Sequence, residues 1–174
     1  MLNGPIPPHV DPRKLADRGA SLQGSLPLSR FERLSAQLVD TTGDVHASFT
    51  FERDELGAPL MRGVLETEVR MICQRCLDVA ALPIHGEYTY VVVWPGSEQS
   101  VPKAYDTLEV GEEPLDLLTL VEDELLLALP IVPVHDPEDC QQPAGLDEPE
   151  PSEDEVKRSN PFSVLAQLKR DPNG

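Results

Sequence analysis

Aromatic residues, cysteines and long apolar runs are all scarce in this chain of 174 residues. Only 5% of its residues are aromatic, too few for the stacking platforms that bind single-stranded nucleic acid. The longest apolar run, Leu125 to Leu129, is far shorter than the roughly 20 residues that a bilayer-spanning helix needs. Residues 1–8 have neither the basic start nor the apolar run of a secretory signal. We therefore expect a cytoplasmic protein that makes no membrane contact.

Basic residues are missing from one long stretch, and this absence accounts for the whole net charge. Residues 106–155 hold 17 acidic side chains and no Lys or Arg, and the formal net charge is -17. The remaining residues are balanced, with 14 acidic and 14 basic side chains. A negative field of this kind attracts basic proteins and repels phosphate backbones. Five basic residues near the N-terminus could form a small positive patch that binds RNA only weakly. They are Arg13, Lys14, Arg18, Arg30 and Arg33.

The centre of the chain predicts an antiparallel sheet. Apolar and polar residues alternate from Val45 to Glu52 and again over residues 64–72, and residues 79–94 are rich in β-branched and aromatic side chains. Short turns separate these strands, which favours an antiparallel meander. Residues 106–110 predict a further short strand. The fold class is therefore α+β over residues 1–135, with a sheet curved towards a small barrel and helices on one side.

Three segments predict helices that pack on this sheet. Asp11 and Pro12 suit the N-cap and first position of a short helix. Residues 28–38 carry an apolar stripe at helical spacing, and residues 115–129 carry a stronger one between Pro114 and Pro130. The acidic run 122–124 inside the last helix predicts a solvated face. Paired catalytic carboxylates are not expected there, because consecutive helical positions point in different directions.

The C-terminal part predicts a tail with a short helix. Residues 136–159 are acidic and proline-rich, which is typical of a disordered linker. Over residues 160–170, Asn160 and Pro161 suit a helix start, and Phe162, Leu165 and Leu168 form a short apolar stripe. This helix either docks on its own domain or enters a groove of a partner, and the sequence leaves both open.

Three thiols and one imidazole form a candidate metal site. Cys73 and Cys76 make a Cys-x-x-Cys pair at a break between strands, and His135 and Cys140 follow far downstream. This ligand set suits a tetrahedral structural zinc ion, which would pin the base of the acidic tail to the sheet. Two other interpretations stay open: Cys73 is a core residue and the others are incidental, or the pair has a redox role. No combination of nucleophile, base and oxyanion hole is evident.

A set of short motifs occurs in order along the second half of the chain. The motifs are the run from Glu122 to Pro130, the run from Val132 to His135, Cys140, and the segment Asn160-Pro161-Phe162 with Leu165, Leu168 and Lys169. Together with Cys73, Cys76 and residues 105–110, they resemble the YceD family of large ribosomal RNA subunit accumulation proteins. The resemblance covers most of the chain from about Leu22 onward. It implies a role in synthesis, processing or stability of 23S ribosomal RNA, and it brings no catalytic residues with it.

Two hypotheses follow from the charge pattern and the resemblance. In the first, the chain is a non-enzymatic ribosome biogenesis factor. Its acidic segment shields a basic large-subunit ribosomal protein, or a basic face of a pre-ribosomal particle, and 23S rRNA is reached indirectly. In the alternative, the chain is a metal-dependent RNA-processing enzyme that uses the Cys/His site. Four protein ligands would leave no open position for water or substrate, so we favour the first hypothesis.

Overall fold

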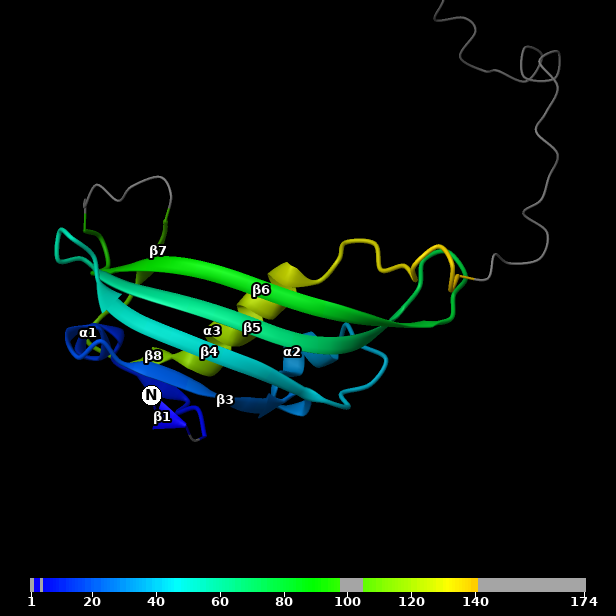
Figure 1. The fold of residues 1–174 in the computed structure, drawn as a ribbon, viewed down its shortest axis with the longest axis horizontal. Coiled ribbons are helices and arrows are strands. Elements are labelled where there is room, and N and C mark those ends of the chain that lie inside the picture. The colour runs from blue at the N-terminus through cyan, green and yellow to red at the C-terminus, as the bar shows by residue number, and fades with distance from the viewer. Residues whose placement is uncertain (1, 4, 98–104, 141–174) are drawn as a thin grey trace, which may run out of the picture. The chain divides into compact units, whose positions relative to one another are not determined.

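The computed structural model describes residues 2–3, 5–97 and 105–140 of the chain (Figure 1). The strands of the main sheet are β1 (Leu2–Asn3), β3 (Ser21–Pro27), β4 (Asp44–Arg53), β5 (Pro59–Ile72), β6 (Val79–Val93) and β7 (Asp106–Glu109). A second, small sheet pairs β2 (His9–Val10) with β8 (Leu115–Asp116). The helices are α1 (Pro12–Asp17), α2 (Glu32–Ser35) and α3 (Leu117–Ala128), with a 3₁₀ turn over Leu28–Arg30.

The predicted antiparallel meander forms the centre of the sheet. Strands β3, β4, β5 and β6 pair antiparallel with their sequence neighbours. In β4 the alternate residues Val45, Ala47, Phe49 and Phe51 are buried, which explains why its period-two pattern is visible in the sequence. The two edge strands differ from the prediction, since β1 joins β3 and β7 joins β6 in parallel. The sheet is therefore mixed, within an α+β fold.

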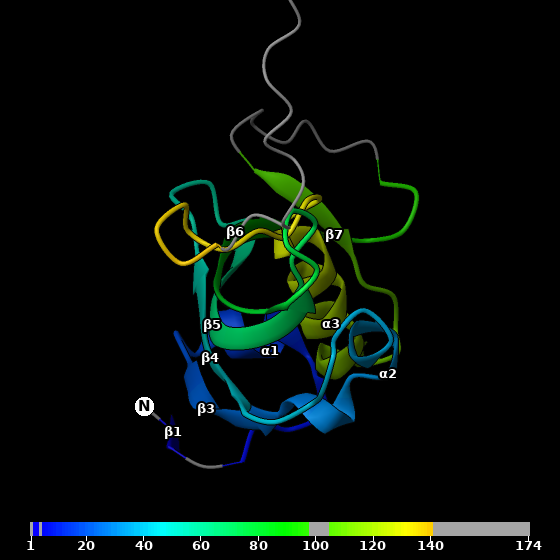
Figure 2. The same cartoon turned by 90° about the vertical axis from the view of Figure 1, so that its right-hand side faces the viewer.

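The sheet curves but does not close into the barrel that we expected. Its strand order runs from β1 to β7, and no pairing between these two edge strands is present among the described residues. Figure 2 shows the sheet bending partly around α3, which lies on its inner face. Three residues on one face of α3, Leu117, Val121 and Leu125, are fully buried in the core formed with this face of the sheet. The helix thus occupies the space that the curved sheet leaves open.

Two helix predictions need correction at their ends. The helix α3 begins at Leu117 rather than at Leu115, because residues 115–116 pair with β2. The Asp116 carboxylate then caps the helix by accepting from the N–H groups of Leu118 and Thr119. The segment 28–38 is not one helix, since Phe31 has extended backbone angles that separate the 3₁₀ turn from α2. Its apolar stripe is nevertheless buried as expected, including Leu28 and Leu34.

The described part of the chain ends at Cys140, which is also the last residue of its compact unit. Asp136 begins a turn in which its carbonyl oxygen accepts from the N–H groups of Asp139 and Cys140. The rest of the predicted linker and the predicted helix over residues 160–170 lie outside the described residues. No helix among the described residues is long and apolar enough to cross a membrane.

Candidate metal centre

Two segments that are distant in the sequence meet at one end of the sheet. The first is the β5–β6 turn, and the second is the chain from Leu129 to Cys140 that follows α3. The Gln74 N–H donates to the Pro133 carbonyl oxygen at 2.8 Å. The His135 ring contacts the first residue of β6, with 3.0 Å between Nε2 and the Val79 carbonyl oxygen. These contacts fix both segments against each other independently of any bound ion.

The β5–β6 turn has a compact backbone that presents two thiols on the same side. The Cys73 N–H donates to the Asp78 carbonyl at 2.8 Å, and the Leu77 N–H donates to the Cys73 carbonyl at 3.0 Å. The Arg75 N–H points at the Cys73 Sγ atom at 3.4 Å. Leu77 has a positive φ of 65°, the only non-glycine residue of the described chain in this region. A left-handed residue here reverses the chain so that it can enter β6.

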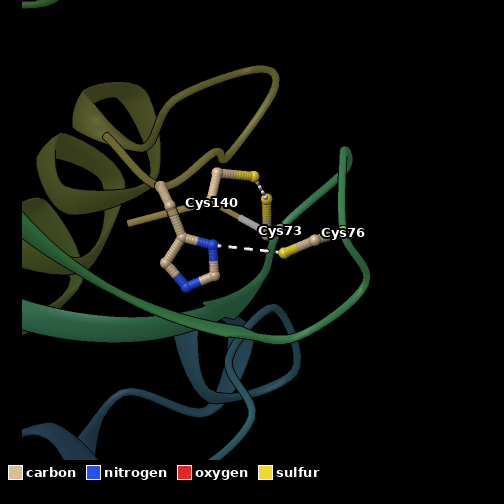
Figure 3. A group of neighbouring side chains, drawn as sticks. Cys73, Cys76 and Cys140 are labelled. Atoms are coloured by element: carbon tan, nitrogen blue, oxygen red, sulfur yellow. Dashed lines mark hydrogen bonds between the residues drawn. The ribbon is translucent and has the colours of Figure 1, made fainter. Parts of the chain in front are cut away.

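All four predicted ligands come together in this place (Figure 3). Their ligand atoms lie within 4.8 Å of one another, with 3.9 Å between the Sγ atoms of Cys73 and Cys140. The Cys76 Sγ atom lies 3.3 Å from Nδ1 of His135. Zinc–sulfur bonds of about 2.3 Å in a tetrahedron imply sulfur–sulfur separations of about 3.8 Å. The spacing is therefore compatible with a tetrahedral ion.

Cys73 is the thiol of the cluster that is most readily deprotonated, whereas burial raises the pKa of Cys140. Burial acts to raise the pKa of Cys73, but hydrogen bonds from the backbone N–H groups of Cys76, His135 and Arg75 outweigh it and lower the pKa to about 5. A thiolate is the form of cysteine that binds metals. The Val79 carbonyl oxygen can only accept, so Nε2 of His135 is the donor in that hydrogen bond and Nδ1 faces the Cys76 Sγ atom. A hydrogen bond with Cys73 raises the pKa of His135.

The acidic run on α3 is not the solvated face that we predicted. Glu122 is buried and accepts from the N–H groups of Arg33 and Leu34 at 2.7 and 3.1 Å, and from Nε of Arg33 at 2.8 Å. Asp123 pairs with the same guanidinium, and Glu124 accepts from the Tyr90 hydroxyl. These contacts cap α2 and tie α3 to β6. They give the run a structural role.

The N-terminal basic residues do not form a free patch. The Arg13 guanidinium donates to the carbonyl oxygens of Val93, Val110 and Gly111 and lies 3.8 Å from the centre of the Trp94 ring. Arg33 is paired with acidic residues of α3, as described above. Lys14 pairs with Asp11. Three of the five cations in the predicted patch, Arg13, Lys14 and Arg33, are thus engaged in contacts within the chain.

Comparison with known proteins identifies the family. The family model described as "Large ribosomal RNA subunit accumulation protein YceD" matches residues 61–169. A curated relative from Haemophilus influenzae, named "Large ribosomal RNA subunit accumulation protein YceD", is 34% identical over 173 residues. The alignment covers 95% of this chain and 97% of the relative. The chain belongs to the YceD family.

This membership confirms the resemblance that the sequence motifs carry. The matched range of the YceD family model includes the four members of the Cys/His cluster and extends well into the part of the chain that follows Cys140. No solved structure matches the chain.

The sequence did not reveal the backbone groups that hold the cluster in shape. The carbonyl oxygens of Pro133 and Val79 orient the turn and the imidazole. Any residue type has a backbone carbonyl, so the sequence does not indicate which carbonyl oxygens accept these hydrogen bonds. The nearest clue in the sequence is Pro133, two positions before His135, because proline restricts the backbone next to that residue.

Proposed function

We propose that this YceD-family chain is a non-enzymatic ribosome biogenesis factor that supports the accumulation of 23S rRNA and the assembly of the large subunit. One observation carries the proposal. A relative that aligns over 95% of the chain is named for the accumulation of the large ribosomal RNA. This role places the protein in the cytoplasm, where ribosomes are assembled.

The acidic surface supports an action through protein contacts. The described segment from Tyr105 to Cys140 carries eleven acidic residues and no Lys or Arg. Among these, ion pairs to basic side chains are present at Glu122 and Asp123, both to Arg33. The resulting field would speed encounters with a basic ribosomal protein and keep phosphate groups away. In this mechanism the factor shields a basic large-subunit protein, or a basic face of a pre-ribosomal particle, until rRNA replaces it.

The Cys/His cluster is proposed to hold one structural zinc ion. Cys73, Cys76, His135 and Cys140 would supply the complete ligand set, and the bound ion would join the β5–β6 turn to the chain after α3. A complete protein shell leaves no position for a substrate, which weighs against the alternative of a metal-dependent RNA-processing enzyme. Metal analysis of purified protein should give one zinc per chain, and a Cys73→Ser variant should lose it. Metal-free wild-type protein of unchanged stability would contradict the site.

The functional test is the rRNA content of cells that lack the protein. We expect the ratio of 23S to 16S rRNA to fall, together with the fraction of complete large subunits in a sucrose gradient. The wild-type gene should restore both. An unchanged 23S to 16S ratio in the deletion strain would refute the proposed function.

A further inference from the structure

An open apolar groove lies beside the Cys/His cluster and has no role in the account so far. Its volume is about 750 Å³. It is formed by the chain after α2, the end of β5 with the following turn, the last turn of α3 and the segment after it. The residues that line it are Ala36, Gln37, Leu38, Val39, Met71, Ile72, Gln74, Leu126, Leu129, Pro130, Ile131, Val132 and Pro133. None of these side chains is charged.

The groove concentrates apolar side chains that are exposed to solvent. Ile131 is 99% exposed and Val132 is 59% exposed, and on the opposite wall Val39 and Ile72 are 46% and 41% exposed. Single exposed apolar residues are common on protein surfaces and need no explanation. A contiguous set that lines one concave surface is instead typical of an interaction site.

Backbone hydrogen bonds hold both walls of the groove in place. On one side the Val39 N–H donates to the Arg70 carbonyl oxygen at 2.8 Å, which fixes the chain after α2 to β5. On the other side the Gln74 N–H donates to the Pro133 carbonyl oxygen at 2.8 Å. Pro130 and Pro133 further restrict the wall that carries Ile131 and Val132. The groove is therefore formed before any partner binds.

The charges around the groove are predominantly negative. Arg70 is neutralised by its ion pair with Asp40, and Arg75, which follows Gln74, is the one other cation next to the described lining residues. Leu126 and Leu129 belong to the C-terminal end of α3, where the helix dipole is negative and the last turn contains no basic residue. The chain that leaves the groove at Pro133 passes through Val134 and His135 and then carries Asp136, Glu138 and Asp139. An apolar surface in such a field is complementary to a segment that has both apolar and basic side chains.

We propose that this groove binds an amphipathic segment of a basic partner protein. The apolar side chains of the segment would cover Ile131, Val132 and Ile72. Its Lys and Arg side chains would face the end of α3 and the acidic chain beyond it. The existence of the groove site stands on the structure, whereas the choice of large-subunit proteins as the pool of partners rests on the proposed function.

Photo-crosslinking from the groove tests this proposal. A benzoylphenylalanine placed at position 131 of the full-length chain would be exposed to the total proteins of large ribosomal subunits, freed of rRNA. We expect a crosslink to a segment that combines apolar residues with Lys or Arg. The matched control carries the same group at position 56, because Leu56 is also exposed (89%) but lies in the β4–β5 turn, at the opposite end of β5. The double variant Ile131→Lys/Val132→Lys, with a photoreactive group at position 39, should reduce the yield about tenfold.

Several outcomes would overturn the proposal. One is a crosslinking yield at position 131 that is no higher than the yield at position 56. Another is a crosslinking yield from position 39 that the Ile131→Lys/Val132→Lys substitutions do not change. A third is crosslinking to a second copy of the chain or to its own residues 160–170. Complementation separates this proposal from the proposed function. If the Ile131→Lys/Val132→Lys variant fully restored 23S rRNA in the deletion strain, the groove would not be needed for rRNA accumulation, and the proposed function itself would still stand. A normal 23S to 16S ratio in the deletion strain, with crosslinks at position 131, would refute the function and support the groove.

Discussion

Leu77 is the residue whose backbone conformation is least suited to its side chain. It has a φ of 65° directly after Cys76, and its side chain is mostly exposed. A left-handed conformation costs an ordinary residue about 1–2 kcal/mol, and glycine avoids this cost. Glycine is also more flexible in the unfolded chain, which offsets part of this gain. We therefore expect Leu77→Gly to raise the free energy of unfolding by about 0.5–1 kcal/mol in urea titrations. Leu56→Gly, at an exposed position without positive φ, should bring no gain; a loss of stability in Leu77→Gly would contradict the interpretation.

Glu122 is the residue whose role differs most from the prediction. Its carboxylate satisfies two N–H groups of α2 and the Arg33 guanidinium in a partly buried position. Replacement by Ala would leave these donors unpaired, so Glu122→Ala should lower the free energy of unfolding by about 1–3 kcal/mol. Asp123→Asn, which alters only an exposed ion pair, should change it by less than about 1 kcal/mol. Equal effects of the two variants would show that Glu122 has no special structural role.

The same carboxylate predicts a pH dependence of stability. Burial acts to raise the pKa of Glu122, but the hydrogen bonds from Leu34 and Arg33 outweigh it and lower the pKa. A lowered pKa in the folded state stabilises the protein above the unfolded-state pKa of about 4.3. This contribution is lost as the pH falls through the lowered folded-state pKa. Urea midpoints measured from pH 7 down to pH 3 should therefore fall less steeply for Glu122→Gln than for the wild type. Parallel curves would contradict this assignment.

At the scale of elements, the β5–β6 turn and the chain after α3 depend on each other. A structural metal at the Cys/His cluster would join them more strongly than the hydrogen bond between Gln74 and Pro133 alone. Chelation should therefore increase amide hydrogen exchange at Gln74, Leu77 and Cys140, while β4 and the middle of β5 stay protected. Hydrogen exchange with mass spectrometry, with and without chelator, measures this. Exchange that does not change on chelation would exclude a bound metal that holds these elements together.

The elements that the sequence predicted well are those whose pattern is local. The alternation in β4 and the apolar stripe of α3 follow from side chains that face one core. The pairing of β1 with β3 and of β7 with β6 joins distant segments, and these short strands have no period of their own. The segment 28–38 departs from a helix because Glu122, far along the chain, caps α2. Such long-range contacts are not encoded in local spacing.

The proximity of the four Cys and His side chains was predictable for a different reason. Two residues separate Cys73 from Cys76 in a turn, and His135 and Cys140 belong to the rare residue types that suit the same ion. Chemistry alone therefore grouped them, without knowledge of the fold. The apolar groove next to them was not predictable, because its walls come from three separate segments, 36–39, 71–74 and 126–133, whose apolar residues resemble ordinary core positions.

At the scale of the whole molecule, the net negative charge is concentrated in residues 106–155, which begin with the edge strand β7 and include α3. The central strands β4 and β5 carry both signs, whereas the charged side chains of residues 106–155 are all acidic. This arrangement supports a protein that recruits basic partners with one part and keeps its fold with another. Family membership adds the biological setting of large ribosomal RNA accumulation.

The most direct test of a protein-mediated action in large-subunit assembly is an affinity pull-down of the tagged full-length chain at low salt, with and without ribonuclease. The account predicts that basic large-subunit proteins are recovered after ribonuclease treatment, and that high salt removes them because exposed charges are screened. Recovery that disappears with ribonuclease would contradict the account, because the chain would then reach its target through RNA.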